Sequence, residues 1–298
     1  MTERSLSPLA AGDLLVTATR LAADARYPTG NGAVRQLGAD LRPKAEALTG
    51  STGLVAGLGR LPDGSVLALD PQARTVARFH PDGRRAPDPD LGGHPFGAML
   101  VTPEGDVLLA EHLCAPSGPF AGEGRVHRFT ADLRPVRRYA TLFHGGVSGF
   151  LGVTHMVLSV DGTTLFHLSE TGPHVYAHDL KADRALGPVF TAREPPAMLF
   201  GLCRLPEGDL LVATGRGLLR LNGGQAGFEP AGHIPLPPAR PGERAGWANV
   251  IVRPRHPTVW ALDFHGGRLA EVDPEGGNVR RLVDLGLPSA LASLLEVP

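Results

Sequence analysis

The chain has little lysine and little cysteine. Among its 298 residues, lysine occurs only at Lys44 and Lys181, so chemistry through a lysine Schiff base has few candidates. Cys114 and Cys203 are the two cysteines, which excludes a disulfide framework and a thiolate zinc cage. Because nothing in this cysteine content points to an oxidising compartment, we expect a cytoplasmic protein.

Long apolar runs and basic runs are also missing. Asp13 interrupts the apolar residues near the N-terminus, and no segment approaches the roughly 18 apolar residues that a membrane span requires. The net charge is −1. Neither nucleic acid nor a membrane is therefore expected as a partner, and a small-molecule substrate is. The sequence leaves the oligomeric state open.

The chain has no Gly-x-Ser-x-Gly elbow, P-loop or His-Glu-x-x-His, so serine hydrolases, nucleotide-binding proteins and zincins have no motif here. What is abundant is glycine and proline, with 39 and 28 residues. This composition is typical of many short strands that are joined by turns.

One pattern occurs six times along the chain. An apolar strand, a turn, a second apolar strand, a loop and a third strand follow one another. The turn is Pro-acidic-Gly at 62–64, 103–105 and 206–208, and it is altered at 160–162 and 255–257. The second strands are expected at 13–18, 65–70, 106–111, 164–169, 209–214 and 258–263. Their ends are 41 to 58 residues apart, which is the size of a four-stranded propeller blade.

The two ends of the chain complement each other. Residues 290–298 have the pattern of a first strand without a partner, and the N-terminal repeat begins with a second strand. Joined, they would complete one blade and remove the open edge of the ring. We predict an all-β, six-bladed β-propeller of four-stranded antiparallel sheets, forming a single domain over residues 1–298.

The expected site lies at one end of the central channel. The long segments 19–32, 111–124, 143–151 and 235–247 all connect strands at the end where first strands begin and second strands end. Long irregular loops on a rigid scaffold commonly carry binding and catalysis.

Histidines and a glutamate at this end are the catalytic candidates. Glu111 could orient His94 or His112 as a general base, or the set could hold a transition metal through nitrogen. The alternative is a solvated rim with a local ion pair. Neighbours on a strand face opposite sides, so either Thr154 or His155 faces the channel, and His155 is catalytic in the second case.

Further candidates fall into two groups. Asn249, Asp263 and Asp70 could supply oxygen ligands to a cation, although the two carboxylates could equally accept hydrogen bonds from loop amides. We expect the substrate to be bound by Phe96, Thr154, Phe200 and Trp247, with ordinary blade packing as the alternative for the aromatic residues. We expect His127, His167 and His178 to be packing or blade-surface residues, and Cys203 to be an inert thiol of the core.

Three segments resemble the SMP-30/gluconolactonase family and its strictosidine synthase-like relatives. They are "THMVLSVDGTTLFHLSETGPHVYAHDLKADRALGPVF" (154–190), "GHPFGAMLVTPEGDVLLAEH" (93–112) and "LFGLCRLPEGDLLVAT" (199–214). The turn and strand motifs also occur in virginiamycin B lyase-like and NHL-type propellers. The resemblance implies six blades, a divalent cation (Ca²⁺, Mg²⁺ or Zn²⁺) in the channel, and hydrolysis of a lactone or ester.

This chain departs from the family at the expected ligands. Thr154 stands where the family has a ligand Asn, and His155 replaces the Gly that follows it. Phe200 occupies an Asp position, Pro95 and Phe96 replace an Asn-Asp pair, and a Glu-Gly-Pro is missing. Most of the residues that supply oxygen ligands to the metal in this family are therefore replaced in this chain.

Three functions follow from these observations. The leading one is lactone or ester hydrolysis, in which Glu111, His112 or His155 deprotonates water. A non-hydrolytic cyclase, isomerase or lyase is the second, and a binding propeller without chemistry is the third. An enzyme should show a pocket with a histidine and a carboxylate in hydrogen-bond reach, whereas a scaffold should show a filled channel and an exposed apolar patch.

Overall fold

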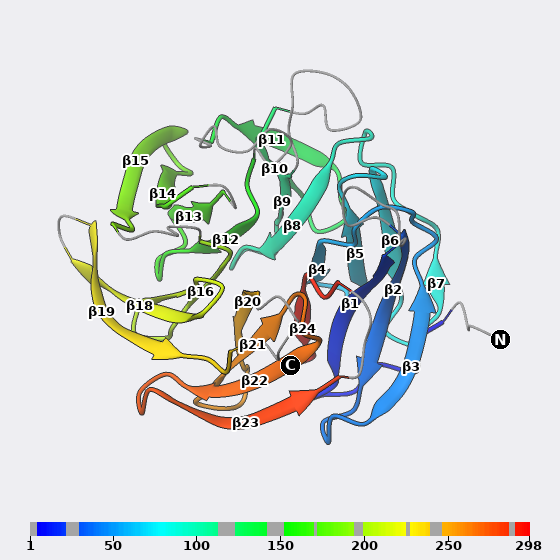
Figure 1. Cartoon of the computed structure of the whole chain (residues 1–298). Coiled ribbons are helices and arrows are strands. Elements are labelled where there is room, and N and C mark those ends of the chain that lie inside the picture. The colour runs from blue at the N-terminus through cyan, green and yellow to red at the C-terminus, as the bar shows by residue number, and fades with distance from the viewer. Residues whose placement is uncertain are drawn as a thin grey trace.

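The structure is a computed structural model, and it describes residues 5–21, 30–112, 123–141, 152–169, 172–193, 199–224, 227–238, 246–285 and 290–298. They form six four-stranded antiparallel sheets arranged in a ring (Figure 1). The predicted all-β, six-bladed propeller is confirmed. The described residues include no helix that is long and apolar enough to cross a membrane.

We number the blades by the position of their strands in the chain. Blade 1 contains β24 (Leu294–Glu296), β1 (Leu14–Leu21), β2 (Gly30–Leu37) and β3 (Pro43–Leu48). Blade 2 contains β4 (Gly57–Arg60), β5 (Val66–Asp70), β6 (Thr75–Phe79) and β7 (Arg85–Ala86). Blade 3 contains β8 (Phe96–Val101), β9 (Val107–Glu111), β10 (Val126–Phe129) and β11 (Pro135–Tyr139).

The remaining blades repeat this order. Blade 4 contains β12 (His155–Leu158), β13 (Thr164–Leu168), β14 (His174–Asp179) and β15 (Arg184–Thr191). Blade 5 contains β16 (Gly201–Arg204), β17 (Leu210–Ala213), β18 (Gly217–Gly224) and β19 (Gly227–Pro235). Blade 6 contains β20 (Trp247–Val252), β21 (Val259–Asp263), β22 (Arg268–Asp273) and β23 (Asn278–Asp284).

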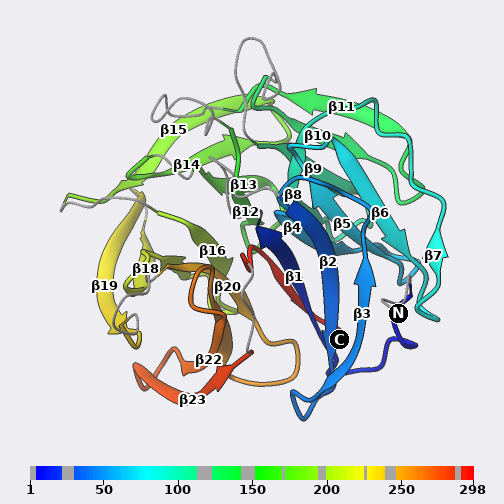
Figure 2. The same ribbon diagram turned by 45° about the vertical axis from the view of Figure 1, so that its right-hand side comes forward.

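The ring closes in blade 1 by pairing the two ends of the chain. β24 is antiparallel to β1, with Leu14 opposite Glu296 and Val16 opposite Leu294. Figure 2 shows the red β24 beside the blue β1. The prediction that both ends share a blade is confirmed. This pairing covers the edge of β1 that would otherwise be open.

The core lies between neighbouring blades. Each second strand is covered on both faces, so β5 and β9 are buried along their whole length and have continuous apolar sequences without alternation. Six apolar clusters fill the layers between blades, one of which joins Leu211 of blade 5 to Trp247 and Ala261 of blade 6. The outer strands β11 and β23 are largely exposed.

Glycine sets the hairpins between the first and second strands. Gly64 and Gly105 have φ of 83° and 90°, a left-handed conformation that side chains rarely adopt. Leu61 and Ser65 form the backbone hydrogen bond that ends the first of these turns. The repeated Pro-acidic-Gly motif is thus a hairpin motif, and it places the tight turns at the end of the ring opposite the long segments.

The four long segments expected to carry function lie wholly or partly outside the described residues, which omit 22–29, 113–122, 142–151 and 239–245. The candidate site is therefore built from the strand ends that flank them.

Candidate functional site

A cavity of about 510 Å³ occupies the centre of the ring. Its lining comes from the innermost strands β4, β8, β12, β16 and β20 and from residues at the start of β24. Most of the lining is apolar, including Leu58, Met99, Met156 and Leu202. This volume lies within the usual range for small-molecule sites of about 300–1,000 Å³.

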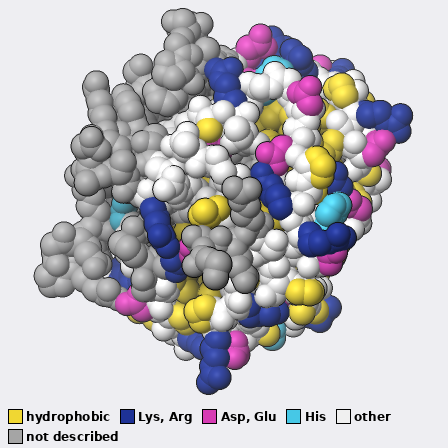
Figure 3. All heavy atoms as spheres, turned by 90° about the vertical axis from the view of Figure 1, so that its right-hand side faces the viewer, with side chains coloured by type: hydrophobic (Ala, Val, Ile, Leu, Met, Phe, Trp, Pro, Cys, Tyr) yellow, Lys and Arg dark blue, Asp and Glu magenta, His cyan; other side chains and the backbone are white. Residues whose placement is uncertain are grey.

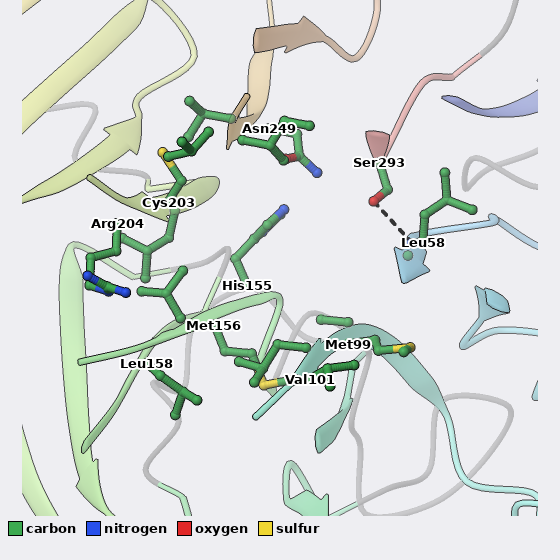
Figure 4. A pocket seen from close by; sticks show the side chains of 18 of the residues that line it. Leu58, Met99, Val101, His155, Met156, Leu158, Cys203, Arg204, Asn249 and Ser293 are labelled. Atoms are coloured by element: carbon green, nitrogen blue, oxygen red, sulfur yellow. Dashed lines mark hydrogen bonds between the residues drawn. The ribbon is translucent and has the colours of Figure 1, made fainter. Parts of the chain in front are cut away.

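The polar side chains that line this cavity include three from different blades. They are His155 of β12, Asn249 of β20 and Ser293, which precedes β24 (Figure 4). Ser293 Oγ accepts a hydrogen bond of 3.1 Å from the Leu58 amide, which leaves the hydroxyl hydrogen available to a ligand. Asn249 Nδ2 donates one bond of 3.0 Å to the Ala292 carbonyl, so the amide is held in place.

The choice between Thr154 and His155 is decided by side-chain direction. Figure 4 shows the His155 imidazole pointing into the cavity. The Thr154 hydroxyl is directed to its own sheet and donates to the Leu168 carbonyl at 3.4 Å. Both residues line the cavity, but His155 supplies the functional group.

A β-bulge separates Asn249 from Trp247. In a regular strand these residues would share one face. The register of β20 shifts between them, so that Trp247 pairs with Asp263 while Asn249 pairs with Leu262. Trp247 is consequently buried between blades 5 and 6, and its Nε1 donates to the Pro237 carbonyl at 3.0 Å.

The expected aromatic wall is not at this cavity. Phe96, Phe200 and Trp247 are all missing from the described lining residues. A second bulge follows Phe96 in β8, and its buried ring packs edge-to-face on His127 with centroids 4.9 Å apart. Phe200 packs on Gly215. The structure places these rings in blade packing, and their substrate-binding role stays a prediction.

Asp70 and Asp263 lie at the ends of β5 and β21, outside the cavity, and bind the amides of the neighbouring loops. Asp70 accepts hydrogen bonds from the amides of Gly53, Gln72 and Ala73, and burial raises its pKa despite them. These contacts match the alternative of carboxylates that hold loop amides.

Asp263 is fully buried and anchors its loop in the same way. It accepts amide bonds, including one of 3.0 Å from Gly266, and pairs with Arg268 at 2.6 Å. With its oxygens used by these donors, a cation at Asp263 would have to displace the arginine.

Glu111 forms a different cluster at the head of blade 3. Its Oε1 accepts a hydrogen bond from His94 Nδ1 at 2.8 Å and another from His127 Nε2 at 3.0 Å. Oε2 accepts the backbone amides of Glu123 at 2.7 Å and Arg125 at 3.3 Å. A carboxylate thus joins two imidazoles, one from the loop before β8 and one from β10.

The charges of this cluster follow from its contacts. Burial alone would raise the pKa of Glu111, but the hydrogen bonds from His127 and the two amides outweigh burial and lower the pKa to about 2. Burial and the neighbouring His127 lower the pKa of His94, against the attraction of Glu111. At neutral pH the cluster therefore holds an anionic carboxylate beside a neutral His94.

His112 is not part of the Glu111 cluster. Successive residues point to opposite faces of a strand, and His112 packs on Gly97 instead, with its amide donating to the Pro95 carbonyl at 2.8 Å. The structure therefore brings together Glu111 and His94 from the predicted catalytic set. It leaves His112 and His155 elsewhere.

Two residues that the sequence did not mark as functional belong to these sites. His127 was expected to pack, yet it shares the face of β9 that carries Glu111 because it pairs with Leu109. This register could have been derived from the strand assignments. Ser293 lies in the tail before β24, where no sequence pattern marks it.

The cation that the family resemblance implies does not fit this channel. Ca²⁺ and Mg²⁺ need several oxygen ligands, usually with carboxylates among them. No Asp or Glu lines the cavity among the residues that the structure describes, and Arg204 is the charged side chain there. We therefore derive no chemical step through a channel metal.

Two buried groups in the blades are unsuited to acid–base chemistry at neutral pH. Burial raises the pKa of Cys203 to about 12 although it borders the cavity, so its thiol stays protonated. Burial, with nearby His178, lowers the pKa of His167 to about 3, so this imidazole stays neutral. His167 stacks on Tyr176 with ring centroids 5.5 Å apart.

His167 should make the protein sensitive to mild acid. Below the ordinary histidine pKa of 6.5, the unfolded chain binds a proton that the folded chain excludes down to a pH of about 3. The free energy of unfolding therefore falls as the pH is lowered through this window, by about 2 kcal/mol from this residue between pH 7 and 5. Denaturant unfolding at both pH values should show a smaller pH effect for His167→Phe than for the wild type. Equal pH effects would contradict the assignment.

Comparisons with known proteins identify the fold. No family model matches this chain, and no curated protein matches it. Among solved structures, the periplasmic gluconolactonase of Pseudomonas aeruginosa is 18% identical with a TM-score of 0.62, covering 92% of this chain and 84% of that one. Virginiamycin B lyase from Staphylococcus aureus is 13% identical with a TM-score of 0.57, covering 92% and 89%.

A third similar structure is a chain of a nidogen/laminin complex. It is 12% identical with a TM-score of 0.64, covering 95% of this chain and 97% of that one. At such identities the likeness shows the propeller fold alone. The neighbours include enzymes and a component of a protein complex, so the site has to decide the function.

Proposed function

We propose that this protein is an enzyme that acts on a small, largely apolar molecule in its central channel, with His155 as the proton-transfer residue. The observation that carries the proposal is the His155 imidazole pointing into a mostly apolar cavity of about 510 Å³. Histidine is the side chain most often used for general acid–base catalysis near neutral pH.

Hydrolysis of a lactone or ester is the reaction that we propose first. His155 takes a proton from water as the water oxygen attacks the carbonyl carbon. The Ser293 hydroxyl and the second Asn249 N–H stabilise the carbonyl oxygen as it becomes negative. The imidazolium then protonates the departing alkoxide, which restores neutral His155. The resemblance to the SMP-30/gluconolactonase family and the gluconolactonase among the structural neighbours support this reaction.

Elimination or isomerisation is the second candidate. The apolar lining and the lack of carboxylates among the described lining residues suit removal of a proton from carbon as well as from water. Virginiamycin B lyase is among the structural neighbours. In this version His155 removes the proton and returns it to the leaving group.

The channel meets the expectation for an enzyme in part, because a histidine lines the cavity but no Asp or Glu does among the described residues. A binding propeller without chemistry is still less well supported. The channel contains a cavity, and the five exposed large apolar residues of the described chain are spread over four blades. They are Leu48, Val136, Val160, Leu186 and Leu282, and Val160 and Leu186 share blade 4, at its turn and its outer strand. Figure 3 shows hydrophobic side chains dispersed among charges of both signs on the face over β3 and β7. Docking surfaces for proteins are usually contiguous.

The location of the site can be tested by filling the channel. Wild-type protein is assayed on lactones and esters of increasing chain length and on substrates that undergo elimination. Ala98 lines the cavity, so Ala98→Phe should lower kcat/KM by at least about tenfold, because the added ring occupies the substrate's space. Ala182→Phe, on an exposed turn of blade 4, is the matched control. Equal activity of both variants would contradict a channel site.

A further inference from the structure

Three metal-ligating side chains converge outside the channel. They are His94 before β8, Glu111 at the end of β9 and His127 near the start of β10. Their ligand atoms all lie within 4.8 Å of one another. The cluster faces blade 2, where Phe96 packs with Leu69 and Leu91, so it is separate from the cavity that contains His155.

The donor set is that of a transition-metal site. Two imidazole nitrogens and one carboxylate oxygen suit Zn²⁺, Fe²⁺, Co²⁺ or Ni²⁺ better than Ca²⁺ or Mg²⁺, which prefer oxygen. Three protein ligands also leave at least one coordination position open, as in catalytic zinc sites. Asp70 and Asp263 lie at the ends of the equivalent strands in blades 2 and 6, but they bind backbone amides and an arginine. Glu111 differs from both because it binds two imidazoles.

Surrounding contacts hold two of the ligands in place. The amides of Glu123 and Arg125 fix Glu111 Oε2, and the ring of Phe96 packs against His127. Such outer contacts orient ligands before a metal binds. Glu111 and His127 are 1% and 4% exposed, so the fold holds the ligand atoms of these two residues in place.

His94 has the freedom to adjust. Its distance of 2.8 Å to Glu111 is shorter than the separation of about 3.3 Å between two ligands of a tetrahedral zinc ion with bonds near 2.0 Å. His94 follows Gly92 and Gly93, both with positive φ, in a connecting loop, and its side chain is 26% exposed. A movement of less than about 1 Å would open the cluster to an ion.

An open coordination position would be accessible from a neighbouring groove. His94 and His127 line a groove of about 470 Å³ together with Arg128, Arg137 and Arg138. Arg138 lies directly opposite His127 in the β10–β11 pair. Asp90 also lines the groove, and Arg128 and Arg137 are paired with Asp106 and Asp183. Arg138, beside His127, is therefore the charge that would favour a small anion as a further ligand of the metal.

We propose that His94, Glu111 and His127 bind one divalent transition-metal ion of the Zn²⁺ type, at a site distinct from the channel. The competing interpretation is a structural network in which Glu111 only accepts hydrogen bonds from two imidazoles. Both interpretations use the same contacts, so the ion itself must be measured.

The test uses tag-free protein that has been stripped with a chelator and dialysed. Calorimetric titration with zinc chloride should show one equivalent bound by the wild type. His94→Ala removes one ligand from a partly exposed loop position and should weaken binding by at least about tenfold, the lower end of losses seen even for outer-shell changes. His256→Ala, at an exposed turn, and His155→Ala, in the channel, should bind zinc like the wild type.

Cobalt provides a second measurement, because a cluster with a purely structural role would give no absorption from bound Co²⁺. Co²⁺ bound by two nitrogens and a carboxylate absorbs visible light, and this absorption should be present in the wild type and lost in His94→Ala and His127→Gln. Circular dichroism confirms that each variant is folded. The proposal is overturned by folded wild-type protein that binds no equivalent of either ion, or by His94→Ala binding zinc as tightly as the wild type.

Discussion

His155→Ala is expected to lower kcat/KM by about 10²- to 10⁴-fold on whichever substrate the wild type turns over, the usual contribution of a general acid–base group. The fold should survive, because the His155 side chain is only partly buried and projects into the channel cavity. The melting temperature should therefore change little while turnover is lost. Steady-state kinetics and thermal unfolding of the same preparations measure both effects.

Chemical rescue separates proton transfer from packing. Truncation of His155 leaves space in a cavity that is open to small molecules, so added imidazole should restore part of the activity of His155→Ala. His155→Gln, which keeps most of the volume but transfers no proton, should be as inactive as the alanine variant and respond less to imidazole. Full activity in either variant would remove His155 from the mechanism. A folded but inactive wild type across the whole substrate panel would favour the binding function.

The strands could be predicted from the sequence because their burial is simple. Second strands such as β5 and β9 are covered by blades on both sides, so they form uninterrupted apolar runs between turn residues. Each second strand begins within one residue of its expected position. The position of β24 was also predictable, because the C-terminal apolar segment had no partner strand and the N-terminal repeat had no first strand.

The arrangement of the site was harder to predict because β-bulges alter side-chain direction. Simple alternation places Trp247 and Asn249 on the same face, and one extra residue at Ala248 sends them to opposite faces. The sequence carries no turn residue or glycine that marks this bulge. The same effect separates Phe96 from the channel.

Charge clusters depend on strand register as much as on residue type. Glu111 and His94 were recognised as a pair from their shared blade, whereas His127 was assigned to packing because it lies within a strand. Its partnership with Glu111 requires the β9–β10 register, in which His127 lies opposite Leu109. Long-range pairing of this kind is fixed by the fold and not by a local motif.

Removing residues 290–298 is expected to unfold the protein or leave it severely destabilised. The deletion removes β24 and exposes the backbone of β1, whose residues Leu14 to Val16 pair with it. It also removes the buried side chains of Leu291, Leu294 and Val297, each of which stabilises the fold by roughly 1.5–3 kcal/mol. The sum is comparable to the whole stability of a typical domain, about 5–15 kcal/mol.

Polar contacts of the tail add to this effect. Glu296 is buried and accepts hydrogen bonds from Trp260 Nε1 at 2.8 Å and Arg253 Nε at 3.0 Å, so its loss leaves two donors of blade 6 without this acceptor. The tail therefore connects blade 6 to blade 1 as well as completing a sheet. Deletion of Pro298 alone, which is exposed, should be without effect and serves as the control.

Adding the missing strand as a peptide distinguishes ring closure from a general loss of stability. A synthetic peptide of residues 290–298 can pair with the edge of β1 by strand addition, and it should raise the melting temperature of the truncated chain in a concentration-dependent manner. A peptide in which the Leu294 position carries aspartate should fail, because this side chain enters the apolar layer between blades 6 and 1. A truncated chain that melts like the wild type without peptide would show that the ring is stable with an open edge, contrary to the role assigned to β24.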